Sequence, residues 1–108
     1  MTLPVYVHPR VQTFLDDNAQ WWAEHHSAEQ AEAWYDGFVE AIFSLEHHPE
    51  GRPLARENDA FPFKVRELYY GVGQKITHRA LFTIRPDQVY VFLIRHVSQA
   101  PVSLDDIS

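Results

Sequence analysis

The spacing of hydrophobic and polar residues predicts a strand and then a helix at the start of the chain. The segment LPVYV (3–7) is short and rich in β-branched and aromatic residues, which is typical of an edge strand. From Val11 to Trp22 the apolar residues recur at helical spacing, and the pattern ends near His26. Pro9 suits the first turn of this helix because its missing N–H would have no intrahelical partner there.

A second helix follows after a very short connection. Ser27, with Gln30 three residues later, forms a capping-box pattern, and an apolar stripe at helical spacing then runs from Ala31 to Leu45. The stripe is followed by three residues that disfavour helix, Pro49, Gly51 and Pro53. Because so few residues connect the two helices, we expect them to pack as an antiparallel helical hairpin.

Three β-type runs complete the pattern: FKVRELYY (63–70), HRALFTI (78–84) and VYVFLIRH (89–96). The last two are separated by RPDQ (85–88), whose proline suits a turn, so they should form a β-hairpin. The sequence therefore predicts an α+β fold with an N-terminal strand, the antiparallel helical hairpin and a three-stranded antiparallel meander. We expect residues 1–108 to form one domain, in which the helices cover one face of the sheet and the other is open.

Strand periodicity places basic side chains on the face expected to be open. In the run 78–84 the apolar alternate residues should face the helices, so Arg79 should point away from them. The run 89–96 is apolar on both faces, as suits a central strand, and we expect Arg95 rather than His96 to point outward. Arginines on neighbouring strands repel unless an anion lies between them. A phosphate backbone or an acidic protein segment is therefore the expected ligand of a target-binding site made of Lys64, Arg66, Arg79, Arg95 and His78. The alternative is that Glu67, Asp87 and the acidic tail neutralise these cations within the fold.

Composition and charge narrow the class of protein. The chain has no cysteine, no apolar run long enough to cross a membrane and no signal-peptide pattern, so we expect a cytoplasmic protein that does not contact a membrane. A net charge of −6 argues against general binding to nucleic acid. This charge is divided unevenly, with net −8 over residues 1–63 and net +4 over residues 64–99.

The histidines do not form a metal-binding pattern. The pairs His25–His26 and His47–His48 are expected at the ends of the two helices and so at opposite ends of an antiparallel hairpin, where one ion cannot bind both. Histidines there are better explained by hydrogen bonds to the last carbonyls. We expect neither a metal nor a cofactor. Trp21 lies off the apolar stripe of its helix and is a candidate for contact with a partner or a second copy.

His78 and His96 each adjoin an arginine on a predicted strand. Histidine titrates near neutrality and arginine stabilises phosphorane charge, so such a cluster could support attack of an RNA 2′-hydroxyl on its phosphodiester without a metal. The alternative is that either imidazole is a hydrogen-bonded group in the core. In the first case the catalytic residues would be His96, Arg79 and Arg95.

The order of these segments resembles the RelE/ParE superfamily, the toxins of type II toxin–antitoxin modules. The matching text is AEAWYDGFVEAIFSLEHHPEGRPLARENDAFPFKVRELYYG, HRALFTI and VYVFLIRHVSQ, with "VREL" and "IRH" as its most specific parts. The resemblance implies a toxin that is neutralised by a cognate antitoxin, which wraps around it and alone contacts operator DNA. It also matches Arg66, Arg79 and Arg95 to recurring basic positions, and His96 to the site of a terminal His or Tyr in some RNA-cleaving members.

The resemblance leaves three functions open. Members are either ribosome-dependent mRNA endonucleases or ParE-like inhibitors of DNA gyrase, and a third possibility is a non-toxic protein that only binds the antitoxin. Two departures from the superfamily favour a protein target: the loop GVGQKITHR has only Lys75 before Arg79, and the whole chain is acidic. His78 also replaces a frequent tyrosine. The sequence therefore favours gyrase over ribosome-bound mRNA, and the protein would be an enzyme only in the second case.

Overall fold

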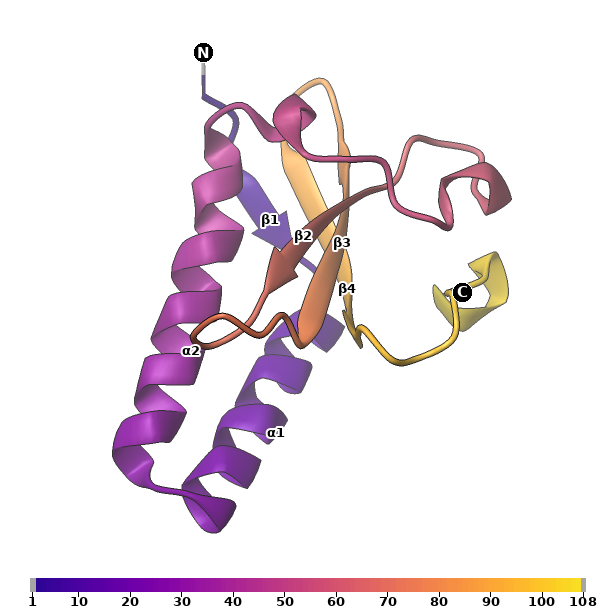
Figure 1. The fold of residues 1–108 in the computed structure, drawn as a ribbon. Helices are drawn as coiled ribbons and strands as arrows, with labels where there is room; N and C mark the ends of the chain where they lie inside the picture. The colour runs from indigo at the N-terminus through magenta and orange to yellow at the C-terminus, as the bar shows by residue number, and fades with distance from the viewer. Residues whose placement is uncertain (1, 108) are drawn as a thin grey trace.

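The computed structural model describes residues 2–107 and has the predicted order of helices and strands (Figure 1). The elements are β1 (Val5–Val7), α1 (Pro9–His25), α2 (Ala28–Phe43), β2 (Arg66–Tyr70), β3 (His78–Ile84) and β4 (Val89–His96). The α+β fold with an N-terminal strand, a helical hairpin and an antiparallel meander is thus confirmed.

Local sequence signals account for the starts of both helices. Pro9 occupies the first turn of α1, and the His8 imidazole accepts a hydrogen bond from the Arg10 N–H at 3.1 Å. The Ser27 hydroxyl caps α2 by accepting a hydrogen bond from the Gln30 N–H, also at 3.1 Å. Each cap satisfies a backbone donor that has no partner within its helix.

Replacing Ser27 with alanine should lower the free energy of unfolding by about 1 kcal/mol, because the Gln30 N–H loses its side-chain acceptor. The matched control is Ser44→Ala at the other end of α2, where the hydroxyl donates to the Ala41 carbonyl and its loss should cost less than about 0.5 kcal/mol. Urea unfolding followed by circular dichroism would measure both. Equal losses for the two variants would show that the cap makes no special contribution.

The four strands lie in the order β1-β4-β3-β2, so β4 is central and β1 is an edge strand, both as predicted. β1 pairs parallel to β4, whereas β2, β3 and β4 pair antiparallel. A β-bulge shifts the register between β3 and β4: Leu81 pairs with Leu93, but Phe82 pairs with Val91. Phe92 is therefore the extra residue, and it packs on the same side as Leu93. This bulge turns Arg95 away from the helices and His96 toward them, in agreement with the expectation for Arg95.

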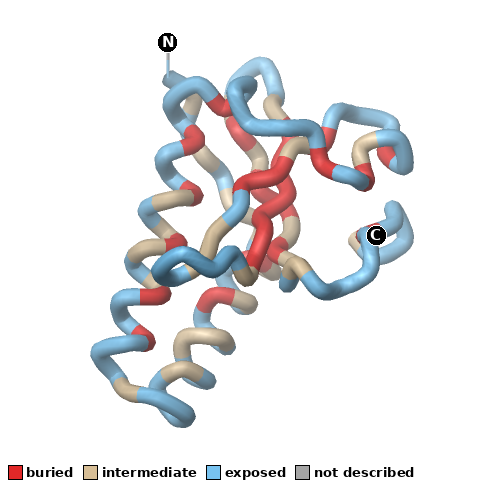
Figure 2. The backbone as a smooth tube through the Cα atoms, viewed as in Figure 1, coloured by how far each residue is buried: buried red, intermediate tan, exposed pale blue. Residues whose placement is uncertain are grey.

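Apolar side chains are buried on both faces of the sheet, so the expectation of an open face is wrong. Figure 2 shows buried residues along the strands, in α2 and in the loop between α2 and β2. The helices cover one face, where Trp34 and Phe38 of α2 pack against residues such as Phe82. The other face is covered by the loop between α2 and β2 and by the C-terminal segment after β4, which both lie on the side opposite the helices (Figure 1). Loop and segment contribute four residues to this second core, Ala55, Phe61, Val65 and Val102.

Two predicted boundaries are also wrong. The strand predicted from residue 63 begins only at Arg66, because Val65 pairs with the loop: its N–H donates to Asn58 Oδ1 and its carbonyl accepts from the Ala55 N–H, each at 2.8 Å. The second helix ends at Phe43 and continues as a 3-10 turn, Ser44–Glu46. His47 and His48 therefore follow the helix instead of closing it, and His48 has a left-handed backbone with φ 51°.

Candidate functional site

Arg79 of β3 is fully buried in an ion-pair network on the sheet face opposite the helices. Its guanidinium makes two hydrogen bonds to the Glu57 carboxylate, one of them at 2.7 Å, and a third to Glu67 at 3.3 Å. The second Glu57 oxygen also accepts a hydrogen bond from the Val102 N–H at 2.8 Å. Glu57 comes from the loop before β2 and Val102 from the C-terminal segment, so the network ties both covering segments to β3.

Electrostatics hold this network in its charged form. Burial raises the pKa of the Glu57 carboxyl, but the hydrogen bonds from Arg79 and Val102 and the guanidinium charge outweigh it, so the pKa lies below its ordinary value. Hydrogen bonding to Glu57 raises the pKa of Arg79 despite its burial. The Tyr69 hydroxyl donates to Glu67 at 2.8 Å, which raises the pKa of Tyr69. Among the described residues, Arg79 Nε has no hydrogen-bond partner.

Arg95 lies directly opposite Arg79 in the β3–β4 ladder, on the same face of the sheet. Its guanidinium donates two hydrogen bonds to the Ala100 carbonyl, at 3.2 and 3.1 Å, where the C-terminal segment leaves β4. The repulsion between the two guanidinium groups is therefore reduced by the two carboxylates around Arg79 and by the Ala100 carbonyl. The predicted need for an anion between these arginines is met within the fold.

The other predicted cations lie elsewhere. Lys64 is exposed in the loop before β2. Arg66 pairs with Phe82, which faces the helices, so it lies on the other side of the sheet from Arg79; its guanidinium donates to the Arg52 carbonyl at 2.6 Å. The expectation that Lys64, Arg66, Arg79 and Arg95 converge on an open surface is therefore wrong. The alternative of internal neutralisation is the correct description for Arg79, since one partner is Glu67.

His78 and His96 do lie together, on the helix side of the sheet. They are register partners at the ends of β3 and β4, with ring centroids 5.3 Å apart in an edge-to-face arrangement. Both line a pocket of about 320 Å³ with Thr77 and with three residues of α1, Asn18, Trp21 and Trp22. The three α1 residues lie in the half of α1 nearer the turn to α2, and this end of the hairpin projects beyond the sheet (Figure 1).

The environment of the two imidazoles differs strongly. His78 is 9% exposed, stacks edge-on against Phe14 and Trp34, and has its Nδ1 2.8 Å from the Thr77 hydroxyl. Burial, with a smaller contribution from the neighbouring His96, lowers the pKa of His78 to about 4. His96 is exposed, and its Nδ1 is 2.7 Å from the Ser98 hydroxyl. At neutral pH the buried imidazole is uncharged and can accept or donate a hydrogen bond, but it supplies no positive charge to an anion.

This geometry limits the chemistry of the pocket. The three residues of the predicted nuclease site, His96, Arg79 and Arg95, do not share a surface, because both arginines point to the opposite face of the sheet from His96. Among the described residues that line the pocket, none is a lysine or an arginine. An attacking or leaving phosphate oxygen would therefore lack the positive charge that stabilises a phosphorane.

Glu57 and Asn18 were missed from the sequence, whereas Trp21 was already a candidate for contact with a partner. Glu57 gave no signal in "RENDAF" beyond being an acid in a polar loop, because its partner Arg79 is 22 residues away. Asn18 gave no signal of its own, although it lies one turn before Trp21, which is off the apolar stripe of α1. Within residues 2–107, no three His, Cys, Asp or Glu side chains lie close enough to hold a metal ion. No helix in that range is long and apolar enough to cross a membrane.

Comparisons with known proteins agree with this fold. Residues 5–101 match the family described as "ParE toxin of type II toxin-antitoxin system, parDE". A solved structure described as "Chromosomal ParDE TA system from P. aeruginosa" is similar with a TM-score of 0.71 and 16% sequence identity, over 90% of this chain and 98% of that chain. No curated protein matches significantly. Because the family match spans most of the sequence, the chain belongs to the ParE toxins and is the toxin of a type II toxin–antitoxin module.

Proposed function

We propose that the protein acts in the cytoplasm by inhibiting DNA gyrase, as a ParE-like toxin that binds a protein target and is not a nuclease. One observation carries this choice over mRNA cleavage: Arg79 is buried in an ion pair on the sheet face opposite His96. A catalytic set of His96, Arg79 and Arg95 therefore has no common surface on which to bind RNA. The net charge of −6 supports the same choice, because it repels nucleic acid.

The residues proposed to contact the target are the cations that remain accessible. Lys64 is exposed, while Arg66 and Arg95 are partly exposed and are held by the carbonyls of Arg52 and Ala100. Arg66 and Arg95 lie on opposite faces of the sheet, so each is a separate candidate contact. His78 lies in the pocket on the helix side and is removed from this group. Arg79 is also removed from this group, because its side chain is fully buried. As a toxin of this class, the protein has a cognate antitoxin as its partner, and we expect it to reach operator DNA only through that antitoxin.

The decisive experiment uses one purified sample in two assays. In the first, plasmid supercoiling by gyrase should fall, or cleaved-DNA complexes should accumulate, as toxin is added. In the second, a reconstituted translation reaction should yield no mRNA ends in the ribosomal A site. His96→Ala is the matched variant: it should inhibit gyrase as well as the parent protein, because no step of target binding requires an imidazole acid or base.

Two outcomes would overturn the proposal. Codon-aligned mRNA cuts that disappear in His96→Ala would establish the nuclease. No growth defect from soluble protein expressed without its antitoxin, together with no effect on gyrase, would identify a non-toxic protein that only binds the antitoxin.

A further inference from the structure

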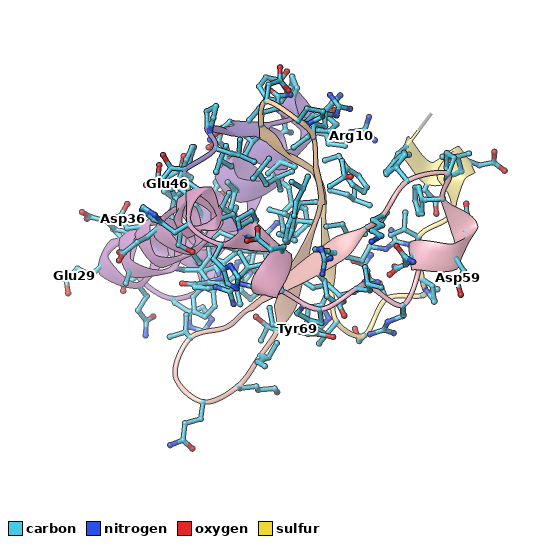
Figure 3. All side chains as sticks on the ribbon, turned by 90° about the horizontal axis from the view of Figure 1, so that it is seen from above. Arg10, Glu29, Asp36, Glu46, Asp59 and Tyr69 are labelled. Carbon is cyan, nitrogen blue, oxygen red and sulfur yellow. The ribbon has the colours of Figure 1, made fainter. Side chains whose placement is uncertain are left out.

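Apart from Arg10 at the start of α1, the helical hairpin contains acids and no lysine or arginine. Residues 11–51 contain no lysine and no arginine but nine acids: Asp16, Asp17, Glu24, Glu29, Glu32, Asp36, Glu40, Glu46 and Glu50. Glu29 and Asp36 of α2 point away from the sheet into solvent (Figure 3). Within the described residues, no ion pair involves any acid between Asp16 and Glu40. Like charges three and four residues apart destabilise a helix. A cationic partner bound to this surface would therefore reduce the repulsion between these carboxylates.

Trp21 is the residue on this surface that is best placed to bind a side chain of a partner. It is 48% exposed, although it belongs to α1 and lies beside the pocket. One face of its indole is stacked on His25, with ring centroids 4.5 Å apart, which holds the ring in place. Asp17 and Glu24 lie four residues before and three residues after it, so both carboxylates are neighbours of the indole on the helix surface.

The pocket beside Trp21 has hydrogen-bonding groups but no fixed positive charge. Asn18 uses its amide N–H to bond the Phe14 carbonyl at 2.9 Å, which leaves its oxygen as an acceptor. His78 is uncharged at neutral pH because of its burial, so it does not repel a cation. A volume of about 320 Å³ is at the small end of ligand pockets and suits one side chain rather than a folded segment.

We propose that this pocket is the anchor point for an arginine side chain of the cognate antitoxin, whose guanidinium stacks on Trp21 between Asp17 and Glu24. The antitoxin segment that lies on the hairpin is accordingly basic. Arginine fits better than lysine, because its planar guanidinium stacks on an indole and offers several donors at fixed angles to carboxylates and to the Asn18 oxygen. The nine carboxylates of residues 11–51 disfavour an acidic or phosphorylated segment, because like charges repel.

The antitoxin anchor depends on membership of a toxin–antitoxin module and not on the cellular target, so a negative gyrase assay does not affect it. The anchor lies at the α1 end of the helix side, whereas Lys64 and Arg95 lie outside it.

The first test uses a tripeptide with blocked ends, Ala-Arg-Ala, titrated into the toxin at millimolar concentration. The indole N–H signals of Trp21 and Trp22 in NMR spectra should shift and saturate. The matched peptide carries citrulline, which has nearly the shape of arginine without its charge, and should bind at least about tenfold more weakly. Trp21→Ala should abolish the shift of Trp22, while Tyr6→Ala, which removes an aromatic ring of nearly equal exposure at β1, should not.

The second test uses the whole complex. Neutralisation of Trp21→Ala by the antitoxin encoded beside its gene should require about tenfold more antitoxin, with the toxicity of the free variant and its melting temperature unchanged. Trp21→Phe, which keeps an aromatic face, should lie in between. Equal binding of the arginine and citrulline peptides, no saturable shift with either, or unchanged neutralisation of Trp21→Ala would each overturn the proposal.

Discussion

Replacing Glu57 with alanine should lower the free energy of unfolding by about 3–5 kcal/mol, because it breaks a buried ion pair. The substitution leaves the Arg79 guanidinium buried, with only the longer contact to Glu67 as compensation. It also removes the acceptor of the Val102 N–H, and so loosens the segment that covers this face of the sheet. Urea unfolding of the purified variant would give the value.

Two further substitutions serve as controls for Glu57→Ala, one at an exposed contact and one at Arg79. The His47 imidazole lies 3.2 Å from the Glu46 carboxylate and both side chains are exposed, so Glu46→Ala should cost less than about 1 kcal/mol. Arg79→Met in the Glu57→Ala background should recover part of the loss, because it removes the uncompensated buried charge. A loss at Glu57 no larger than at Glu46 would mean that the network is not a significant source of stability.

This result changes how toxicity data on Arg79 must be interpreted. A toxin that has lost several kcal/mol is degraded or aggregates in the cell, and its loss of toxicity then reports on folding. Arg79→Ala therefore cannot by itself identify a target-binding residue in this protein. Lys64→Ala can test target binding, because Lys64 is exposed and no hydrogen bond of the described residues involves its side chain.

The parts of the fold that were predicted from sequence are those controlled by local patterns. The cap at Ser27, the proline at the start of α1 and the strands at 78–84 and 89–96 are each specified by residues close in the chain. The covering of the second sheet face depends instead on contacts between distant segments, such as Val102 with Glu57. Short, irregular segments have no periodicity, so nothing in the sequence pattern indicates where they pack.

The candidate site, like the fold, was predicted from sequence only in part. Alternation correctly placed Arg79 on the face opposite the helices, but it could not show that Glu57 reaches the same point from a loop. The bulge at Phe92 explains why alternation alone could not orient Arg95 and His96, since one extra residue reverses the faces after it. The pairing of His78 with His96 in one pocket follows from the register of β3 and β4, which the sequence did not specify.

Acidification should destabilise the protein by about 2 kcal/mol between pH 7 and pH 5, mainly through His78. The pKa of His78 is about 4 in the folded protein, below the ordinary 6.5, because protonation would place a charge in an apolar environment of Phe14 and Trp34. Between these two values the unfolded chain binds a proton that the folded chain does not, so stability falls as the pH falls. The contribution is fully present above pH 6.5 and is lost progressively toward pH 4.

The effect of His78 on stability occurs at higher pH than the effect of the Glu57 carboxylate. The lowered pKa of Glu57 also destabilises the fold in acid, but only as the pH falls below the ordinary value of 4.5. Urea unfolding from pH 8 to pH 5 would therefore isolate the imidazole. His78→Gln should flatten the dependence on pH, whatever its effect on absolute stability. An unaltered slope in His78→Gln would place the acid-sensitive group elsewhere and would remove the basis for treating the pocket as uncharged at neutral pH.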